Sequence, residues 1–104
     1  MPEKLHPTDL EIDSNKLAEL CRRYKVRELS LFGSAVRGEM RPDSDVDLLV
    51  EFQPDANVGL LEHAGLMLDL ELLLNRKVDL VSKRGLKPRI RSSVMADARP
   101  IYAA

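Results

Sequence analysis

The sequence is poor in aromatic residues and cysteine, and it has no long apolar run. Its 104 residues include two phenylalanines, two tyrosines and no tryptophan, so it lacks the aromatic surface on which single-stranded nucleic acids stack. A single cysteine, Cys21, excludes an internal disulfide and a thiolate metal site. No segment approaches the roughly 20 apolar residues of a membrane span, and residues 1–13 lack a signal-peptide core. These features predict a cytoplasmic protein that binds neither membrane nor nucleic acid directly.

What is present is the composition of an ordinary globular domain with an uneven charge distribution. Hydrophobic residues make up 44% and charged residues 32%, and the net charge is -1. Residues 39–71 hold nine acidic side chains and one basic one, whereas residues 83–99 hold six basic side chains and one acidic one. The acidic part could attract a metal ion and the basic part a phosphate. A solvated helix face is the alternative for the basic part.

Apolar periodicity predicts alternating helices and strands. A lead-in over residues 1–13 precedes a single domain over 14–104, whose first helix is capped by Asp13 or Ser14. Helices are further predicted at 34–39, 58–74 and 88–96, the second of them leucine-rich and well buried, and strands at 26–32, 45–52, 77–82 and 100–103. Such an alternation indicates the α/β class, with one small sheet covered by helices mainly on one face.

Two aspartates lie close together in the second predicted strand. Asp45 and Asp47 are two residues apart, so their side chains project from the same face, with Cα atoms about 7 Å apart. Two adjacent carboxylates repel each other and resist joint ionisation. A protein tolerates such a pair by exposing it to water or by binding a cation there, and Mg²⁺ or Mn²⁺ suits oxygen ligands of this kind.

A third acid, Asp79, lies in the next predicted strand between apolar neighbours. If the two strands pair, Asp79 can join Asp45 and Asp47 on one face. Three carboxylates can hold two metal ions roughly 4 Å apart, the geometry that stabilises the attacking and leaving oxygens in phosphoryl transfer. The alternative for Asp79 is an acid in solvent at a strand end.

A Gly-Ser turn precedes the aspartate pair by about ten residues. Gly33 permits close approach of the backbone to a ligand, and free N–H groups there can bind phosphate oxygens. Ser34 adds a hydroxyl, and the guanidinium of Arg37 lies one turn further on. Ser44, just before Asp45, could bond either the backbone or a phosphate. Together these residues indicate a site for a phosphate and its metal ion.

These motifs resemble the nucleotidyltransferase superfamily typified by DNA polymerase beta, and above all its minimal nucleotidyltransferase (MNT) domains. The resemblance rests on the stretch "GSAVRGEMRPDSDVDLLV" and on "RKVDLV" about thirty residues later, and it covers roughly residues 17–102. The family pattern of Gly-Ser, Arg-Gly, Ser-Asp-x-Asp and a later Asp is met without a departure. The resemblance implies a small mixed sheet like the palm of polymerase beta.

The resemblance also implies a reaction. Asp45, Asp47 and Asp79 would hold two Mg²⁺ ions (or Mn²⁺) and act in catalysis, while Gly33, Ser34, Arg37 and Ser44 would bind the nucleotide. ATP would be the substrate, an acceptor hydroxyl would attack its α-phosphorus, and pyrophosphate would leave.

A chain this short has little room for an acceptor site, so the acceptor is expected on a partner. The resemblance implies a HEPN-domain ribonuclease toxin, which the MNT protein neutralises as an antitoxin by transferring AMP to it. Two alternatives stay open: an antitoxin that masks the toxin by binding alone, and a transferase for a small molecule of the aminoglycoside kind. The nucleotide base, the modified residue and the oligomeric state, alone or with another protein, are left undetermined by the sequence.

Overall fold

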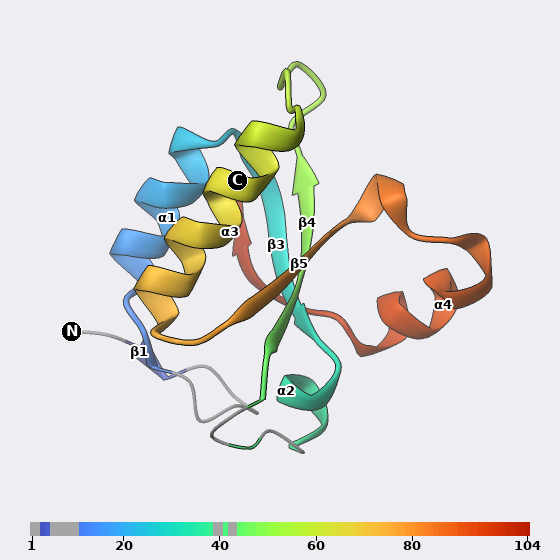
Figure 1. Cartoon of the computed structure of the whole chain (residues 1–104). Coiled ribbons are helices and arrows are strands. Elements are labelled where there is room, and N and C mark those ends of the chain that lie inside the picture. The colour runs from blue at the N-terminus through green and yellow to red at the C-terminus, as the bar shows by residue number, and fades with distance from the viewer. Residues whose placement is uncertain (1–2, 5–10, 39–40, 42–43) are drawn as a thin grey trace.

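A four-stranded mixed sheet forms the centre of the computed structural model (Figure 1), which describes residues 3–4, 11–38, 41 and 44–104. The strand order is β5–β4–β3–β6. The strands are β3 (Val26–Phe32), β4 (Val46–Phe52), β5 (Val78–Ser82) and β6 (Arg99–Ala103). β3 pairs antiparallel with β4 and β6, whereas β4 and β5 are parallel. The predicted α/β class is confirmed, and the mixed character of the sheet that the resemblance implied is present.

The parallel pair requires a crossover, which helix α3 (Leu60–Leu74) provides. Helices α1 (Ser14–Arg23) and α3 lie together on one side of the strands, and α4 (Pro88–Asp97) lies on the other side (Figure 1). Between β5 and α4 the chain forms a short 3-10 helix, η1 (Lys83–Gly85). A one-turn helix, α2 (Ser34–Arg37), follows β3 directly. The predicted helices and strands are therefore all present, with ends shifted by at most two residues.

The core lies between the sheet and the helices α1 and α3. In β4, Val46, Leu48 and Val50 are fully buried in this core. The intervening positions of β4, which include Asp47, Leu49 and Glu51, face the other side of the sheet. The strand therefore separates a packing face from a face that carries ionisable groups.

Helix α1 begins as the sequence predicts. The carboxylate of Asp13 accepts hydrogen bonds from the backbone N–H groups of Asn15 (3.0 Å) and Lys16 (3.1 Å), so Asp13 is the N-cap. Leu17, Leu20 and Cys21 form the buried stripe. Burial raises the pKa of the Cys21 thiol to about 12, which keeps it neutral and unreactive at physiological pH.

We expect Asp13→Ala to lower the free energy of unfolding by about 1 kcal/mol, because two N–H groups at the start of α1 lose their acceptor. Asp13→Ser should retain most of the stability, since serine is also a good N-cap. Urea denaturation of the three proteins measures the effect. Equal stability of the alanine variant and the wild type would show that water replaces the cap without loss.

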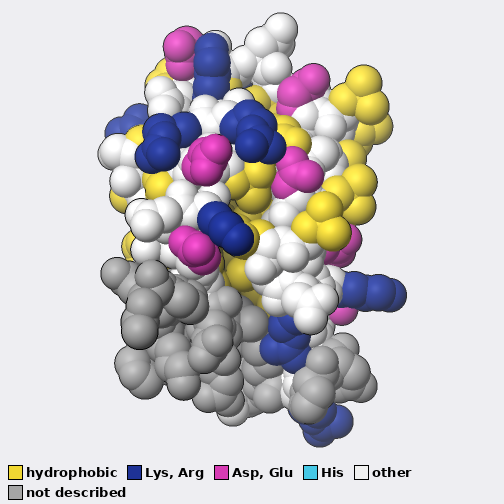
Figure 2. Space-filling model, turned by 90° about the vertical axis from the view of Figure 1, so that its left-hand side faces the viewer, with side chains coloured by type: hydrophobic (Ala, Val, Ile, Leu, Met, Phe, Trp, Pro, Cys, Tyr) yellow, Lys and Arg dark blue, Asp and Glu magenta, His cyan; other side chains and the backbone are white. Residues whose placement is uncertain are grey.

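Helix α3 differs from its prediction. Its leucine-rich sequence predicts a well-buried helix, and Leu66, Leu70 and Leu74 are buried. Four other leucines, however, are 55–84% exposed: Leu60, Leu61, Leu68 and Leu72. The reason is that the described part of the chain packs against one side of α3 only. Figure 2, which views the molecule from the side of α1 and α3, shows hydrophobic side chains that stand out at the surface.

The lead-in also differs from its prediction as a loop. Its described residues form two short strands, β1 (Glu3–Lys4) and β2 (Glu11–Ile12), which pair antiparallel. Ile12 is 1% exposed and belongs to the core. The domain boundaries drawn at residues 13 and 14 remain a prediction, and most of the turn predicted at 40–44 lies outside the described residues. None of the helices that the structure describes is both long and apolar enough to cross a membrane.

Candidate active site

The three aspartates lie on neighbouring strands at one end of the sheet. Asp47, the second residue of β4, is directly opposite Asp79 in the parallel register between β4 and β5. Residues in such register project from the same face, and adjacent strands are about 4.8 Å apart. Asp45 immediately precedes β4. Asp45 and Asp79 are exposed, whereas Asp47 is half-buried. The structure therefore brings Asp79 beside the pair, as the pairing of the two strands requires.

The electrostatics of Asp47 reflect this crowding. Partial burial raises the pKa of its carboxyl, the negative charges of Asp79 and Asp45 raise it further, and the positive charge of Arg37 opposes them. Among the described residues no donor makes a hydrogen bond to Asp47. A carboxylate that is crowded by two like charges is stabilised in its ionised form by a nearby positive charge.

Gly33 brings the backbone against Asp47. It links β3 to α2 with φ +70° and ψ −142°, a conformation that is essentially restricted to glycine. A Cβ atom added at Gly33 would lie 2.4 Å from Oδ2 of Asp47, so the glycine has room only for its hydrogen. Ser34 follows as the first residue of α2. The Gly-Ser turn and the aspartates are therefore adjacent parts of one site.

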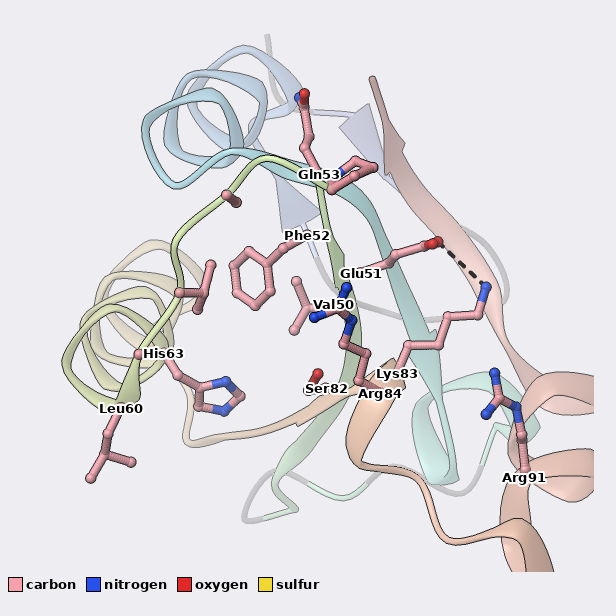
Figure 3. A pocket seen from close by; sticks show the side chains of 14 residues that line it. Val50, Glu51, Phe52, Gln53, Leu60, His63, Ser82, Lys83, Arg84 and Arg91 are labelled. Carbon is pink, nitrogen blue, oxygen red and sulfur yellow. Dashed lines mark hydrogen bonds and ion pairs between the residues drawn. The ribbon is translucent and has the colours of Figure 1, made fainter.

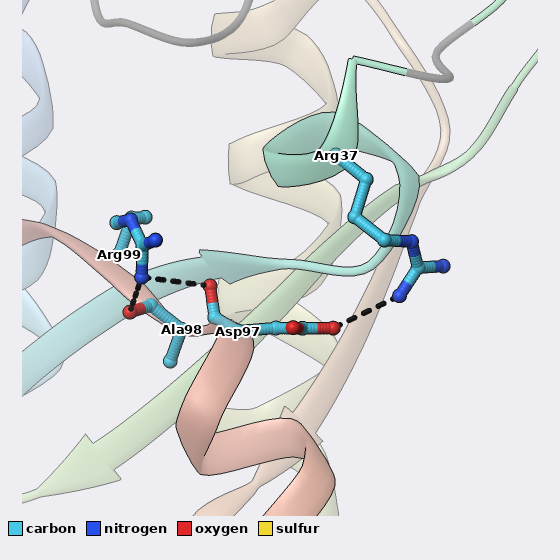
Figure 4. A network of polar contacts seen from close by, with 4 residues as sticks. All are labelled: Arg37, Asp97, Ala98 and Arg99. Atoms are coloured by element: carbon cyan, nitrogen blue, oxygen red, sulfur yellow. Dashed lines mark hydrogen bonds and ion pairs between the residues drawn. The ribbon is translucent and has the colours of Figure 1, made fainter.

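Arg37 ends the one-turn helix α2 and makes an ion pair that the sequence did not predict. Its Nη1 atom donates to Oδ2 of Asp97, the last residue of α4, at 2.9 Å (Figure 4). The two residues are 60 positions apart, so no local spacing could reveal the pair. The only sequence signal was that Asp97 is the single acid in a basic segment.

Ser44 bonds the backbone. Its hydroxyl accepts a hydrogen bond from the N–H of Arg41 at 2.8 Å, and its own N–H donates to the carbonyl of Arg41 at 3.0 Å. The guanidinium of Arg76 also donates to this carbonyl. Of the two partners considered for Ser44, the structure supplies the backbone, and the serine closes a turn just before Asp45.

The fit of a metal ion depends on the donor set. In the described part of the chain, no group of three or more His, Cys, Asp or Glu side chains is arranged so that it could hold a metal ion by itself. Mg²⁺ usually binds one or two carboxylates and completes its shell with waters and substrate phosphates. The exposed oxygens of Asp45 and Asp79 and the crowded carboxylate of Asp47 fit that mode, in which the nucleotide brings the remaining ligands.

A cavity of about 780 Å³ lies at the opposite end of β4 from Asp47 (Figure 3). The ladder between β4 and β5 ends at Val50 and Ser82, and the cavity opens where the chain turns away into η1. Its lining includes Phe52, His63, Lys83, Arg84 and Arg91. The ring of His63 is held by the carbonyl of Leu80 at 2.9 Å. The cavity shares no residue with the carboxylate site, so its size does not identify the active site.

Comparison with known proteins agrees with this geometry. The family model of the nucleotidyltransferase domain matches residues 14–101. The protein adenylyltransferase MntA of Thermococcus cleftensis is 47% identical over 79 residues, which are 76% of this chain and 78% of that protein.

Solved structures are similar in fold. A structure described as a candidate minimal nucleotidyltransferase is 47% identical, with a TM-score of 0.71, and the match covers 84% of this chain and 87% of that one. A toxin–antitoxin complex with AMP-PNP gives a TM-score of 0.72 at 24% identity over 89% and 75% of the chains. A Shewanella oneidensis complex of a tri-AMPylated HEPN toxin with its MNT antitoxin gives 0.63 at 22% identity over 88% and 70%. The length of the match and the identity to MntA show that this chain belongs to the nucleotidyltransferase domain family.

Proposed function

We propose that this protein is a Mg²⁺-dependent adenylyltransferase that transfers AMP from ATP to a hydroxyl group of a HEPN-domain toxin and so acts as its antitoxin. The observation that carries the proposal is the position of Asp47, between Asp79 on the next strand and the backbone of Gly33. The groups proposed to bind phosphate and those proposed to bind metal are thereby adjacent. Family membership and the relative named protein adenylyltransferase support the reaction class.

Each residue has a role that follows from its position. Asp45, Asp47 and Asp79 would hold Mg²⁺, which when bound supplies positive charge to the phosphate oxygens. The backbone N–H groups at Gly33 and Ser34 would bind the terminal phosphates of ATP.

The transfer itself is an in-line displacement. The acceptor oxygen attacks the α-phosphorus, the bond from that phosphorus to the β-phosphate oxygen breaks, and pyrophosphate leaves. Asp79, which is exposed at the start of β5, would accept the proton of the acceptor hydroxyl. Arg37 would pair with the phosphates of ATP in the bound substrate as much as in the transition state, so its contribution would be to nucleotide binding. Most of the acceleration in such reactions comes from positioning and charge stabilisation.

The acceptor is assigned to a protein partner because of what surrounds the site. The cavity of 780 Å³ lies at the far end of β4, so it cannot hold an acceptor next to Asp79. The structures of related fold that contain both partners are toxin–antitoxin complexes, one with an AMPylated HEPN toxin. A hydroxyl presented by a toxin bound over the carboxylates completes the site.

Neutralisation by masking alone is the second candidate function. The four exposed leucines of α3 favour it, because a helix with so much exposed apolar surface is typical of a binding surface. Masking would need contact but neither Mg²⁺ nor the aspartates. The two candidates therefore differ in what they require of Asp79.

We expect the purified protein to label its cognate HEPN toxin with [α-³²P]ATP in the presence of Mg²⁺, and to lose that labelling in EDTA or in the Asp79→Asn variant. The reason is that the acceptor hydroxyl would lose its proton acceptor and the site one of its metal ligands. Toxin ribonuclease activity, measured in the same samples, should recover when labelling is lost. If the toxin stays inhibited by the Asp79→Asn variant, masking is the mechanism; if no label reaches the toxin at all, the transferase proposal is wrong.

A further inference from the structure

We propose that Asp97 is a positioning residue for Arg37, which it holds beside the carboxylate end of the sheet and keeps available for the nucleotide phosphates. The inference rests on the proposed function, since it presumes that Arg37 meets a phosphate. It concerns Asp97, a residue of α4 that is not part of the Gly-Ser, Arg-Gly, Ser-Asp-x-Asp and later Asp pattern.

The pair joins a one-turn helix to a helix that lies on the surface. Helix α2 has only four residues and ends at Gly38, which is in the left-handed conformation. Helix α4 has ten residues, none of them buried. The ion pair at 2.9 Å between Arg37 and Asp97 connects them directly (Figure 4).

The placement of Asp97 is unfavourable for helix α4 by itself. An acidic side chain at a helix C-terminus lies near the negative end of the helix dipole, and residues 80–104 contain no other acid. Arg99 offsets part of this, because its Nη1 atom lies 3.4 Å from the carbonyl of Asp97 and 3.2 Å from that of Ala98 (Figure 4). Exposed ion pairs add little to stability, and the Arg37 and Asp97 side chains are 51% and 33% exposed. The pair therefore fixes the position of the Arg37 guanidinium and adds little to the free energy of unfolding.

The same pair limits where the guanidinium can go. The negative charges of the site attract Arg37, whose positive charge opposes the rise in the pKa of Asp47. An arginine that moved onto these carboxylates would occupy the place of the cation they are proposed to bind. Asp97 supplies a competing carboxylate, which Arg37 contacts at 2.9 Å. The guanidinium is thus held within electrostatic reach of the cluster while the cluster oxygens stay free.

The test is a double-mutant cycle on toxin labelling. Asp97→Asn should raise the KM for ATP and lower kcat/KM by about five- to tenfold, because a misplaced phosphate ligand loses pre-organisation, with kcat changed by less than twofold. Asp97→Glu should recover most of the loss. In an Arg37→Gln background, Asp97→Asn should have no further effect. Asp55→Asn, in the exposed loop after β4, is the matched control and should behave as wild type.

A second measurement keeps this inference separate from the proposed function. In ¹⁵N-labelled protein without nucleotide, the Nε–Hε resonance of Arg37 should be sharp in the wild type and in Asp55→Asn, and shifted and broadened in Asp97→Asn. An unchanged resonance overturns the positioning role even if labelling is robust. So does an equal loss of kcat/KM from Asp97→Asn with and without Arg37. Absence of labelling by the wild type overturns the proposed function. The Nε–Hε resonance of Arg37 then still tests whether Asp97 fixes the position of Arg37.

Discussion

Gly33→Ala is expected to reduce AMP transfer at least 100-fold while the protein still folds. A Cβ atom at Gly33 would lie 2.4 Å from Oδ2 of Asp47, and also 3.3 Å from its Cγ. The carboxylate can rotate away, so the clash does not prevent folding. The rotation displaces the carboxylate of Asp47 by about 1 Å, and a displacement of that size at a reacting centre costs about 100-fold in rate. The backbone strain at φ +70° adds a loss of stability of about 1–3 kcal/mol.

Gly38→Ala separates the clash from the strain. Gly38 also has a positive φ, +72°, but a Cβ atom there would meet nothing within 4 Å. Its left-handed conformation costs alanine about 1 kcal/mol, which lowers the melting temperature of a domain of this size by about 4–8 °C. We therefore expect Gly38→Ala to lose stability but to keep transfer within a few-fold. Labelling and thermal denaturation of both variants measure the two effects, and equal losses of activity would contradict the role of the Gly33–Asp47 contact.

The sequence predicted those features that depend on local spacing. Strand β3 runs from Val26 to Phe32, as its apolar pattern indicates. Helix α3 ends at Leu74, the predicted end, and Asn75 follows in the left-handed conformation. The convergence of Asp47 and Asp79 followed from one assumption, that the two strands pair. Each of these rests on periodicity or on a neighbour in sequence.

What the sequence could not predict depends on contacts between distant segments. Four leucines of α3 are exposed because nothing in the described part of the chain packs on that side of the helix, and hydropathy cannot tell an internal contact from a surface left for a partner. The ion pair between Arg37 and Asp97 joins residues 60 positions apart. Its formation requires β6 to lie beside β3, which brings the end of α4 near α2.

Asp47→Asn should abolish AMP transfer, by a factor of about 1,000 or more, without lowering the stability of the protein at neutral pH. In the folded protein the pKa of Asp47 is raised above its ordinary value of 3.8. The folded state therefore binds the proton more tightly than the unfolded state, and the ionised carboxylate opposes folding. Asparagine has the same shape and no charge, and the substitution removes no hydrogen bond that a described residue donates to Asp47.

The sign of the pH dependence follows from the direction of that shift. Below the ordinary pKa of an aspartate, Asp47 is protonated in both states and its charge has no effect on stability. As the pH rises through 3.8 and then through the raised value in the folded state, the wild type loses stability that Asp47→Asn retains. The difference between the two proteins should thus be near zero at low pH and should favour Asp47→Asn at pH 7. Urea denaturation at several pH values, with Asp55→Asn as the control, measures this difference.

With Mg²⁺ and nucleotide bound, the wild type should become more stable than Asp47→Asn. This reversal would connect the repulsion around Asp47 with the proposed function. A cation that binds the folded site alone stabilises it in proportion to the logarithm of its concentration above Kd. Adding Mg²⁺ with a non-hydrolysable ATP analogue should therefore raise the melting temperature of the wild type and of Asp55→Asn, but not that of Asp47→Asn. An equal rise in all three proteins would mean that the ion binds elsewhere. A less stable Asp47→Asn at pH 7 without Mg²⁺ would mean that the carboxylate is a structural group, and the crowding of Asp45, Asp47 and Asp79 would then need another explanation.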